Sequence, residues 1–178
     1  MTNQLGFYIE LGKCTGCEAC TVACKSENNT PLKVNWRWVL EQNKGKYPNP
    51  KRVFVTMACF HCENPACLKS CPEDAITKRE NDGIVLIDQE KCVGCKRCIW
   101  ACPYGAPQFQ VETEKVEKCT FCVQRIEEGL NPACVDTCVG RALHFGDIKE
   151  IARKPEAQRK IEGFANPDLT NPSVRFKL

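Results

Sequence analysis

The sequence predicts an α+β fold in which short strands, short helices and many loops form two repeated units. Sixteen cysteines fall into four groups of four along the 178 residues. The segment around the first group is repeated around the third, which indicates duplication of one structural unit. Short β-rich runs accompany the groups, and prolines limit the helices that could follow them.

Each group of cysteines, or tetrad, starts with C-x2-C and ends with C-x3-C. The tetrads are Cys14, Cys17, Cys20, Cys24 (one); Cys59, Cys62, Cys67, Cys71 (two); Cys92, Cys95, Cys98, Cys102 (three); and Cys119, Cys122, Cys134, Cys138 (four). Tetrads one and three have the C-x2-C-x2-C-x3-C spacing, which supplies three thiolates to one iron–sulfur cluster and a fourth to its neighbour. Because no cysteine is left over, the pattern predicts four 4Fe-4S clusters, two pairs in tandem bacterial-ferredoxin-like units, and a role in electron transfer.

Two other uses of cysteine are possible in principle. A disulfide framework is typical of short secreted domains with a signal peptide, and the segment before Cys14 lacks the pattern of a cleavable leader. Zinc knuckles also contain C-x2-C pairs, but the triple C-x2-C-x2-C found twice here is not typical of them. Both alternatives are therefore disfavoured.

Local patterns place the remaining elements. Strands are expected at Leu5 to Glu10, Val53 to Met57, Ile84 to Asp88 and Ala142 to Phe145. Helices are expected at Ala19 to Ser26 and Cys98 to Cys102, and another from an Asp147 cap until Pro155 interrupts it. Each unit should therefore combine a strand, a ligand loop and a short helix.

The expected organisation has three parts. Residues 1–52 with 104–148 form the first unit, which carries tetrads one and four and includes an insertion at 28–51. Residues 53–103 form the second unit with tetrads two and three, and 149–178 form a polar tail that lies along this subunit or a neighbour. In the insertion, Trp36 and Trp38 are expected to pack onto the body rather than to form a partner surface.

Several residues near the cysteines have expected roles. Gly16 and Gly94 suit ligand loops because glycine permits positive φ, and such loops aim backbone N–H groups at sulfur. His61 is expected to shape its loop, with a hydrogen bond that tunes its cluster as the alternative. Trp100 is expected to shield a cluster as a hydrophobic cover. No catalytic constellation and no flavin, nicotinamide or nucleotide motif accompanies them.

Charge and hydropathy limit the possible partners. The formal charge of +3 counts cysteines as neutral, whereas four oxidised clusters at about −2 each bring the loaded protein to about −5. No nucleic-acid partner is therefore inferred, and no apolar run approaches the ~20 residues of a membrane-spanning helix. Only about a third of the residues are apolar once cysteine is set aside, so the chain should fold poorly without its clusters.

Basic residues flank the tetrads and have two readings. They can be solvated surface groups, or they can offset cluster charge and raise reduction potentials. These residues are Lys13, Lys25, Lys91, Lys96, Arg97, Lys118 and Arg125.

Together with the four ordered tetrads, three further motifs carry a resemblance to a known family. They are Cys-Pro-Tyr-Gly-Ala-Pro at 102–107, Lys-Cys-Thr-Phe-Cys at 118–122 and Pro-Ala-Cys-Val-Asp-Thr-Cys at 132–138. The sequence resembles the iron–sulfur electron-transfer (beta) subunit of the dimethyl sulfoxide reductase and polysulfide reductase group of molybdenum oxidoreductases. The resemblance covers Leu5 to Ile148 and part of the tail, although Val139 stands where the family usually has proline.

This resemblance implies that tetrad one pairs with four and tetrad two with three. The implied ligand sets are Cys14, Cys17, Cys20 and Cys138 (the Cys14 set); Cys24, Cys119, Cys122 and Cys134 (the Cys119 set); Cys71, Cys92, Cys95 and Cys98 (the Cys92 set); and Cys59, Cys62, Cys67 and Cys102 (the Cys59 set). Some relatives have tryptophan at the position of Cys95 and a 3Fe-4S cluster, so the cysteine here implies four 4Fe-4S clusters.

The resemblance also implies a non-catalytic relay between two partners. One is a large molybdenum or tungsten bis-pyranopterin catalytic subunit, expected nearest the Cys14 set, and the other is an integral quinone-binding membrane anchor, expected nearest the Cys59 set. The relay subunit would be peripheral to the membrane, on the outer face by co-export, with a cytoplasmic position as the alternative.

Two rival functions remain open from the sequence. One is a ferredoxin-like subunit of a soluble formate dehydrogenase, hydrogenase or CO dehydrogenase system, and the other is a metal-stabilised structural or interaction protein.

Overall fold

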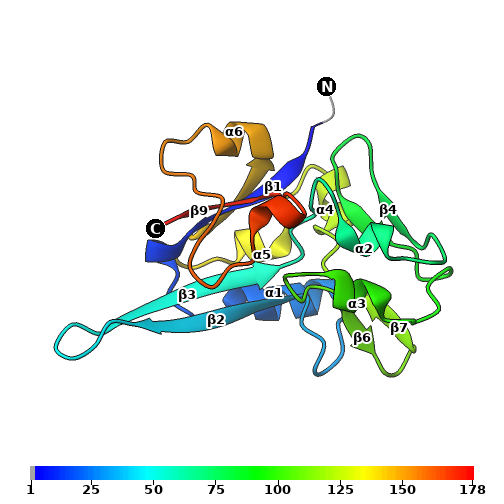
Figure 1. Cartoon of the computed structure of the whole chain (residues 1–178), viewed down its shortest axis with the longest axis horizontal. Coiled ribbons are helices and arrows are strands. Elements are labelled where there is room, and N and C mark those ends of the chain that lie inside the picture. Colours follow the sequence, from blue (N-terminus) through cyan, green and yellow to red (C-terminus); the bar gives the residue numbers. More distant parts are fainter. Residues whose placement is uncertain (1–2) are drawn as a thin grey trace.

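The computed structural model describes residues 3–178 as short elements joined by long loops (Figure 1). The strands are β1 (Leu5–Glu10), β2 (Arg37–Lys44), β3 (Lys51–Ala58), β4 (Ile76–Lys78), β5 (Val85–Ile87), β6 (Gln108–Gln110), β7 (Lys115–Glu117), β8 (Leu143–Asp147) and β9 (Val174–Lys177). The α-helices are α1 (Ala19–Asn28), α2 (Ala66–Lys69), α3 (Arg97–Ala101), α4 (Val123–Glu127), α5 (Ala133–Asp136) and α6 (Ile148–Ala152). Two 3₁₀ helices are η1 (Leu11–Lys13) and η2 (Pro167–Leu169).

A three-stranded sheet in the order β8-β1-β9 joins both ends of the chain. β1 pairs antiparallel with β8, Phe7 opposite Phe145, and parallel with β9, Phe7 opposite Val174. Buried Phe7, Val174 and Phe176 belong to the main hydrophobic core, where Phe7 stacks on Phe121 at 4.4 Å between ring centroids. The tail therefore completes the central sheet of its own subunit.

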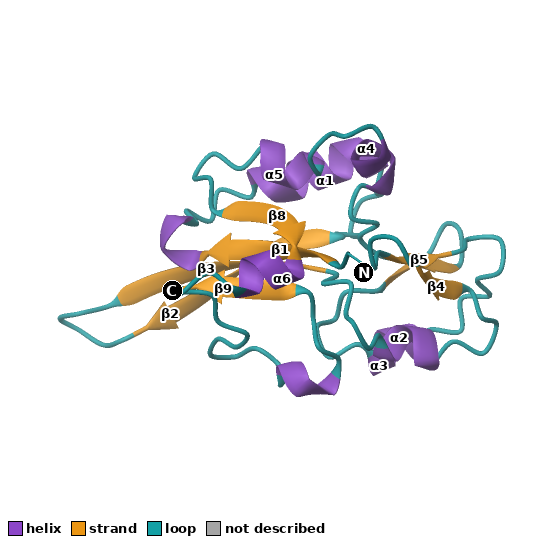
Figure 2. Ribbon diagram, turned by 90° about the horizontal axis from the view of Figure 1, so that it is seen from above, coloured by secondary structure: helices purple, strands orange, loops and turns teal. Residues whose placement is uncertain are grey.

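The other strands form two-stranded sheets, of which β2–β3 is the longest. This hairpin projects from the body in both ribbon views (Figures 1 and 2). Its base packs inward, because Trp38 contacts the main core and Trp36 contacts the small core around Ala58 and Ala106. The predicted packing of both tryptophans is confirmed.

Helices that follow the ligand loops pack in two pairs. α1 contacts α5, and α2 contacts α3, so the pairs lie on different sides of the molecule (Figure 2). α1 and α3 each start after a residue with positive φ, Glu18 and Lys96. α2 and α5 each start after a proline, Pro65 and Pro132. The geometry therefore repeats between tetrads one and three, and between two and four.

Most predicted elements are confirmed. β1 has the expected bounds, and α1, α3, β3, β5 and β8 differ from the expected ranges by a few residues at most. The Asp147 side chain caps α6 by accepting from the backbone N–H groups of Lys149 and Glu150. Strands β2, β4, β6, β7 and β9 were not expected from local pattern.

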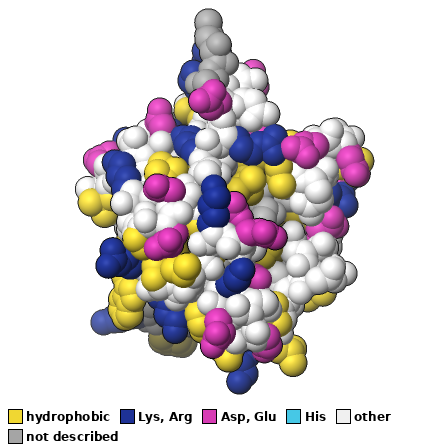
Figure 3. Space-filling model, turned by 90° about the vertical axis from the view of Figure 1, so that its right-hand side faces the viewer, with side chains coloured by type: hydrophobic (Ala, Val, Ile, Leu, Met, Phe, Trp, Pro, Cys, Tyr) yellow, Lys and Arg dark blue, Asp and Glu magenta, His cyan; other side chains and the backbone are white. Residues whose placement is uncertain are grey.

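Basic and acidic side chains are interspersed on the face of the molecule shown in Figure 3. Within residues 3–178, no helix has both the length and the apolar character needed to cross a membrane.

Candidate cluster-binding sites

Three cavities are each bordered by four cysteines from two tetrads. Cys14, Cys17, Cys20 and Cys138 line the first; Cys71, Cys92, Cys95 and Cys98 line the second; and Cys59, Cys62, Cys67 and Cys102 line the third. In each case three cysteines of one tetrad meet the last cysteine of another. These groupings coincide with three of the sets implied by resemblance.

The remaining four cysteines are also neighbours. Cys24, Cys119, Cys122 and Cys134 are all buried. Cys24 lies within electrostatic range of Cys122 and Cys134, and Cys119 lies within range of Cys24 and Cys134. The structure therefore brings all sixteen thiols into four groups of four.

The chemistry of these sites fits a multi-iron cluster. Zinc holds its thiolates at about 2.3 Å, and no three His, Cys, Asp or Glu side chains in the described part of the protein converge closely enough for a single ion. All sixteen cysteines are free thiols rather than disulfides. Four thiols at the edge of one cavity match the Cys₄ ligation of a 4Fe-4S cluster.

Backbone N–H groups point at several sulfur atoms, as expected. Phe121 N–H donates to Cys119 Sγ at 3.3 Å, and Ala142 N–H donates to Cys138 Sγ at 3.2 Å. Gly16 and Gly94 have φ of 71° and 65°, so the predicted need for positive φ is confirmed. A Cβ at Gly94 would overlap the backbone carbonyl oxygen of Glu114, so only glycine fits there without displacement.

Burial dominates the electrostatics of the thiols. It raises the pKa of Cys24, Cys62 and Cys67 to about 12. Without iron these side chains are protonated at neutral pH, whereas cluster ligation requires thiolates. Loading the sites therefore releases protons and couples iron binding to folding.

The four sets follow one another through the molecule. Cys20 and Cys24 of α1 join the Cys14 set to the Cys119 set. Cys119 packs with Cys59 in one small core, and Cys67 packs with Cys98 in another. The order is therefore the Cys14, Cys119, Cys59 and Cys92 sets. Within residues 3–178, exposed thiols occur only in the first and last sets, at Cys17 and Cys95. The expectation that the Cys59 set lies nearest the membrane partner stays a prediction, although the packing places that set between the Cys119 and Cys92 sets.

Two expectations about aromatic neighbours have different outcomes. His61 is fully buried with φ 42°, and its Nδ1 accepts from Val85 N–H at 3.0 Å. Its carbonyl accepts from the side chains of Gln4 and Ser173, so its role in shaping the loop is confirmed. Trp100 is 86% exposed, and the prediction that it covers a cluster is wrong because its side chain points to solvent.

One of the seven flanking basic residues, Lys118, is an internal cation. It is 3% exposed, and its Nζ donates to the backbone carbonyls of Val85 and Cys119. Its charge lies close enough to Cys67 to oppose the rise in that thiol's pKa that burial causes. Lys13, Lys91, Lys96 and Arg97 are exposed, as the solvated-surface reading expected.

Arg37 was not expected near the cysteines, because it lies in the segment read as an insertion. The β2–β3 pairing carries it into the interior, where it is 1% exposed and lies beside Cys20, Cys24, Cys119 and Cys134. A basic residue next to two tryptophans offers no local signal of burial; only the strand pairing shows it.

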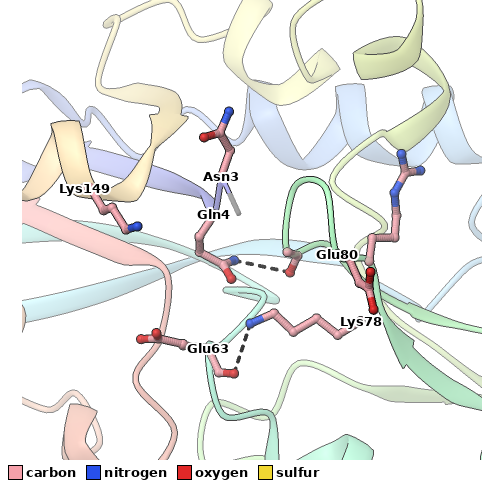
Figure 4. A pocket seen from close by; sticks show the side chains of 8 residues that line it. Asn3, Gln4, Glu63, Lys78, Glu80 and Lys149 are labelled. Carbon is pink, nitrogen blue, oxygen red and sulfur yellow. Dashed lines mark hydrogen bonds between the residues drawn. The ribbon is translucent and has the colours of Figure 1, made fainter. Parts of the chain in front are cut away.

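A further cavity lies away from the thiols. It is open to solvent and is lined by Asn3, Gln4, Glu63, Lys78, Arg79, Glu80, Gly83 and Lys149. Figure 4 shows Lys78 reaching across it to the backbone carbonyl of Glu63, at 3.0 Å. Its charges are mixed in sign and it contains no cysteine, so it plays no part in the cluster sites.

Comparison with protein families gives two matches to models described as 4Fe-4S dicluster domains. One covers residues 13–76 and the other covers residues 51–148. The fold therefore contains two tandem ferredoxin-like dicluster domains of small helices and strands.

Curated relatives match nearly the whole sequence. The B component of the anaerobic dimethyl sulfoxide reductase of Escherichia coli is 38% identical over 185 residues, covering 99% of this protein and 90% of the relative. The B component of the selenate reductase of Mesobacillus selenatarsenatis is 37% identical, with 94% and 70% covered. The B component of the tetrathionate reductase of Salmonella typhimurium is 46% identical, with 83% and 60% covered.

Proposed function

Because this protein belongs to the iron–sulfur electron-transfer subunits of the dimethyl sulfoxide reductase group of molybdoenzymes and carries four 4Fe-4S clusters, we propose that it relays electrons between a quinone-binding membrane anchor and a molybdenum or tungsten bis-pyranopterin catalytic subunit. The clusters supply one-electron transfer, and the protein fixes their spacing, burial and surrounding charge. The observation that carries the proposal is the continuous series of four thiol sets with an exposed thiol only in its first and last members.

The proposed ligands are the Cys14, Cys119, Cys59 and Cys92 sets. Three of them are supported by a cavity that four thiols share, and the Cys119 set is supported by mutual proximity. The same pairing divides the protein into two proposed units, 1–52 with 104–148 and 53–103. Packing of α1 on α5 and of α2 on α3 supports this division, although β3 runs across the boundary at 52.

Exposed apolar side chains support a partner at each end of the series. Val22 and Val139, 65% and 78% exposed, lie beside the Cys14 set, while Val93 and Trp100, 63% and 86% exposed, lie in the segments of the Cys92 set. Exposed apolar side chains beside an exposed thiol are suited to contact with a partner protein. We therefore assign the catalytic subunit to the Cys14 end and the anchor to the Cys92 end, in place of the Cys59 end.

Site-specific cross-linking tests this orientation. A photoreactive amino acid at position 22 should link the protein to the large subunit, and one at position 100 should link it to the anchor. A reactive group at Tyr47, which is 95% exposed and lies in the turn of the β2–β3 hairpin, outside the ligand loops, is the control. Cross-links from positions 22 and 100 to the same partner would contradict the assignment.

We further propose that the complex lies on the outer face of the membrane after co-export with its catalytic partner. Protease treatment of intact spheroplasts should then degrade the relay subunit, and protection equal to that of a cytoplasmic marker would contradict it.

Metal analysis tests the relay itself. The complex should be purified anaerobically from native membranes through a tag on this protein, and molybdenum, tungsten, nickel and iron should be counted together. We expect molybdenum or tungsten with about sixteen irons for four 4Fe-4S clusters. Nickel, or iron alone in a soluble fraction, would favour a soluble dehydrogenase or hydrogenase system instead.

A further inference from the structure

Arg37 is a buried cation without a carboxylate partner. None of the acidic side chains that the structure describes pairs with it. Its guanidinium lies 4.7 Å above the ring of Phe7, and its Nη1 donates to Thr56 Oγ1 at 2.9 Å. An isolated charge in a protein interior is costly unless an opposite charge compensates it. A compensating group must therefore lie beside Arg37 in the working protein.

The unused hydrogen-bond donors of Arg37 indicate where that group lies. Nε and Nη2 are buried and have no protein acceptor among the described residues. The neighbouring sulfur atoms belong to Cys134, Cys119, Cys20 and Cys24, three of which are in the Cys119 set. Neutral thiols cannot balance a guanidinium, whereas a cluster bound to four thiolates carries about −2 when oxidised.

We propose that Arg37 is a positioning residue for the cluster of the Cys119 set. Its free N–H groups donate hydrogen bonds to the sulfur atoms of that site, and its fixed charge makes that cluster easier to reduce. Reduction adds one negative charge, and a nearby buried cation favours the more negative state. Arg37 lies within electrostatic range of Cys24, Cys119 and Cys134, three of the four thiols of that set. This inference rests on the ligand sets given under the proposed function.

A second contact connects Arg37 to the neighbouring cluster. Thr56 is 2% exposed and accepts a hydrogen bond from Arg37. Thr56 Oγ1 also lies 3.7 Å from Cys20 Sγ, and a hydroxyl that accepts from Arg37 has its own hydrogen free to donate to that sulfur. Arg37 therefore acts directly at the Cys119 set and through Thr56 at the Cys14 set.

The test is a redox titration of the purified complex, with each cluster followed by electron paramagnetic resonance. In Arg37→Met, the equilibrium for reducing the Cys119-set cluster should become about tenfold less favourable or more, which is a fall of 59 mV for one electron. Arg37→Lys keeps the charge and loses the fork of donors, so its midpoint should lie between wild type and Arg37→Met. Thr56→Val should lower the Cys14-set midpoint and leave the Cys119-set midpoint unchanged.

The matched control is Arg52→Met, which removes the same charge from the same hairpin. Arg52 is exposed and pairs with Glu41 on the neighbouring strand, so all four midpoints should equal those of wild type. Four wild-type midpoints in Arg37→Met, with a full iron content, would overturn the proposal. If Arg37→Met does not assemble, unchanged midpoints in both Arg37→Lys and Thr56→Val would overturn it.

These readouts are independent of the partners of the protein. A complex with nickel or without molybdenum would refute the proposed relay and leave the Arg37 titration valid. Cys134→Ala identifies the signal of the Cys119-set cluster, because that signal should be lost. If Arg37→Met shifts only the midpoint of another cluster, the ligand assignment is refuted and the charge effect is not.

Discussion

Cys102 belongs to tetrad three, but the other three thiols of its proposed set come from tetrad two. Replacing Cys102 with alanine should therefore damage the cluster of the Cys59 set and not that of the Cys92 set. Cys102 follows α3, which carries Cys98, yet it borders the cavity of Cys59, Cys62 and Cys67. In C102A the Cys59 set keeps three of its four thiols, and the Cys92 set keeps all four. We therefore expect a loss of about one to four of sixteen irons, from one cluster alone.

The assay compares C102A with two single variants in an anaerobic complex. Iron is counted, and the spectrum of each reduced protein is recorded by electron paramagnetic resonance. The spectrum of C102A should match that of Cys67→Ala, from tetrad two, and differ from that of Cys98→Ala, from tetrad three. A match between C102A and Cys98→Ala would refute the reasoning, because it would mean that each tetrad binds its own cluster.

Three further changes test the loop, the sheet and the charges. Gly94→Ala should abolish the Cys92-set cluster, which is measured as lost iron. The control is Gly129→Ala, because Gly129 has φ 75° and no atom lies within 4 Å of an added Cβ. Gly129→Ala should retain all iron and lower the free energy of unfolding by only about 1–2 kcal/mol. Phe176→Ala, at a fully buried position of β9, should destabilise the loaded protein by about 3–5 kcal/mol in denaturant titrations; a change below about 1 kcal/mol would show that the sheet does not need β9. The pKa of Glu10 is lowered by a hydrogen bond from Lys13, so its stabilising effect is present above the unfolded pKa of about 4.3 and is lost as pH falls through the lower folded pKa. Glu10→Gln should therefore be less stable than wild type by up to about 1 kcal/mol at pH 7, and a gap that does not shrink as pH falls below about 4.3 would contradict this origin.

Local sequence was sufficient for elements whose signals are short-range. β1 follows from an apolar run, α6 from the Asp147 cap, and the ligand loops from cysteine spacing with Gly16 and Gly94. In each case the determining interactions involve residues a few positions apart. The pairing of tetrad one with four and of two with three was implied by the family resemblance and not by the internal repeat, and the packing of α1 on α5 and of α2 on α3 supports it.

Long-range pairing was not accessible from the sequence pattern alone. β2 has a mixed sequence without clean alternation, and it forms a strand because it pairs with β3 along its whole length. β9 joins β1 from the opposite end of the sequence. The burial of Arg37 and the interior position of the Cys59 set both depend on such distant contacts, so neither could be read from neighbouring residues.

The way the thiol sets combine distant segments has a consequence for biosynthesis. The Cys59 and Cys92 sets are complete once residue 102 has been made, whereas the Cys14 set waits for Cys138 and the central sheet waits for β9. Domains generally fold from the N-terminus during synthesis, but here the middle of the protein can mature first. In the proposed sets, Cys14, Cys17 and Cys20 are thus made before the other tetrads but gain their fourth thiol only when Cys138 has been made.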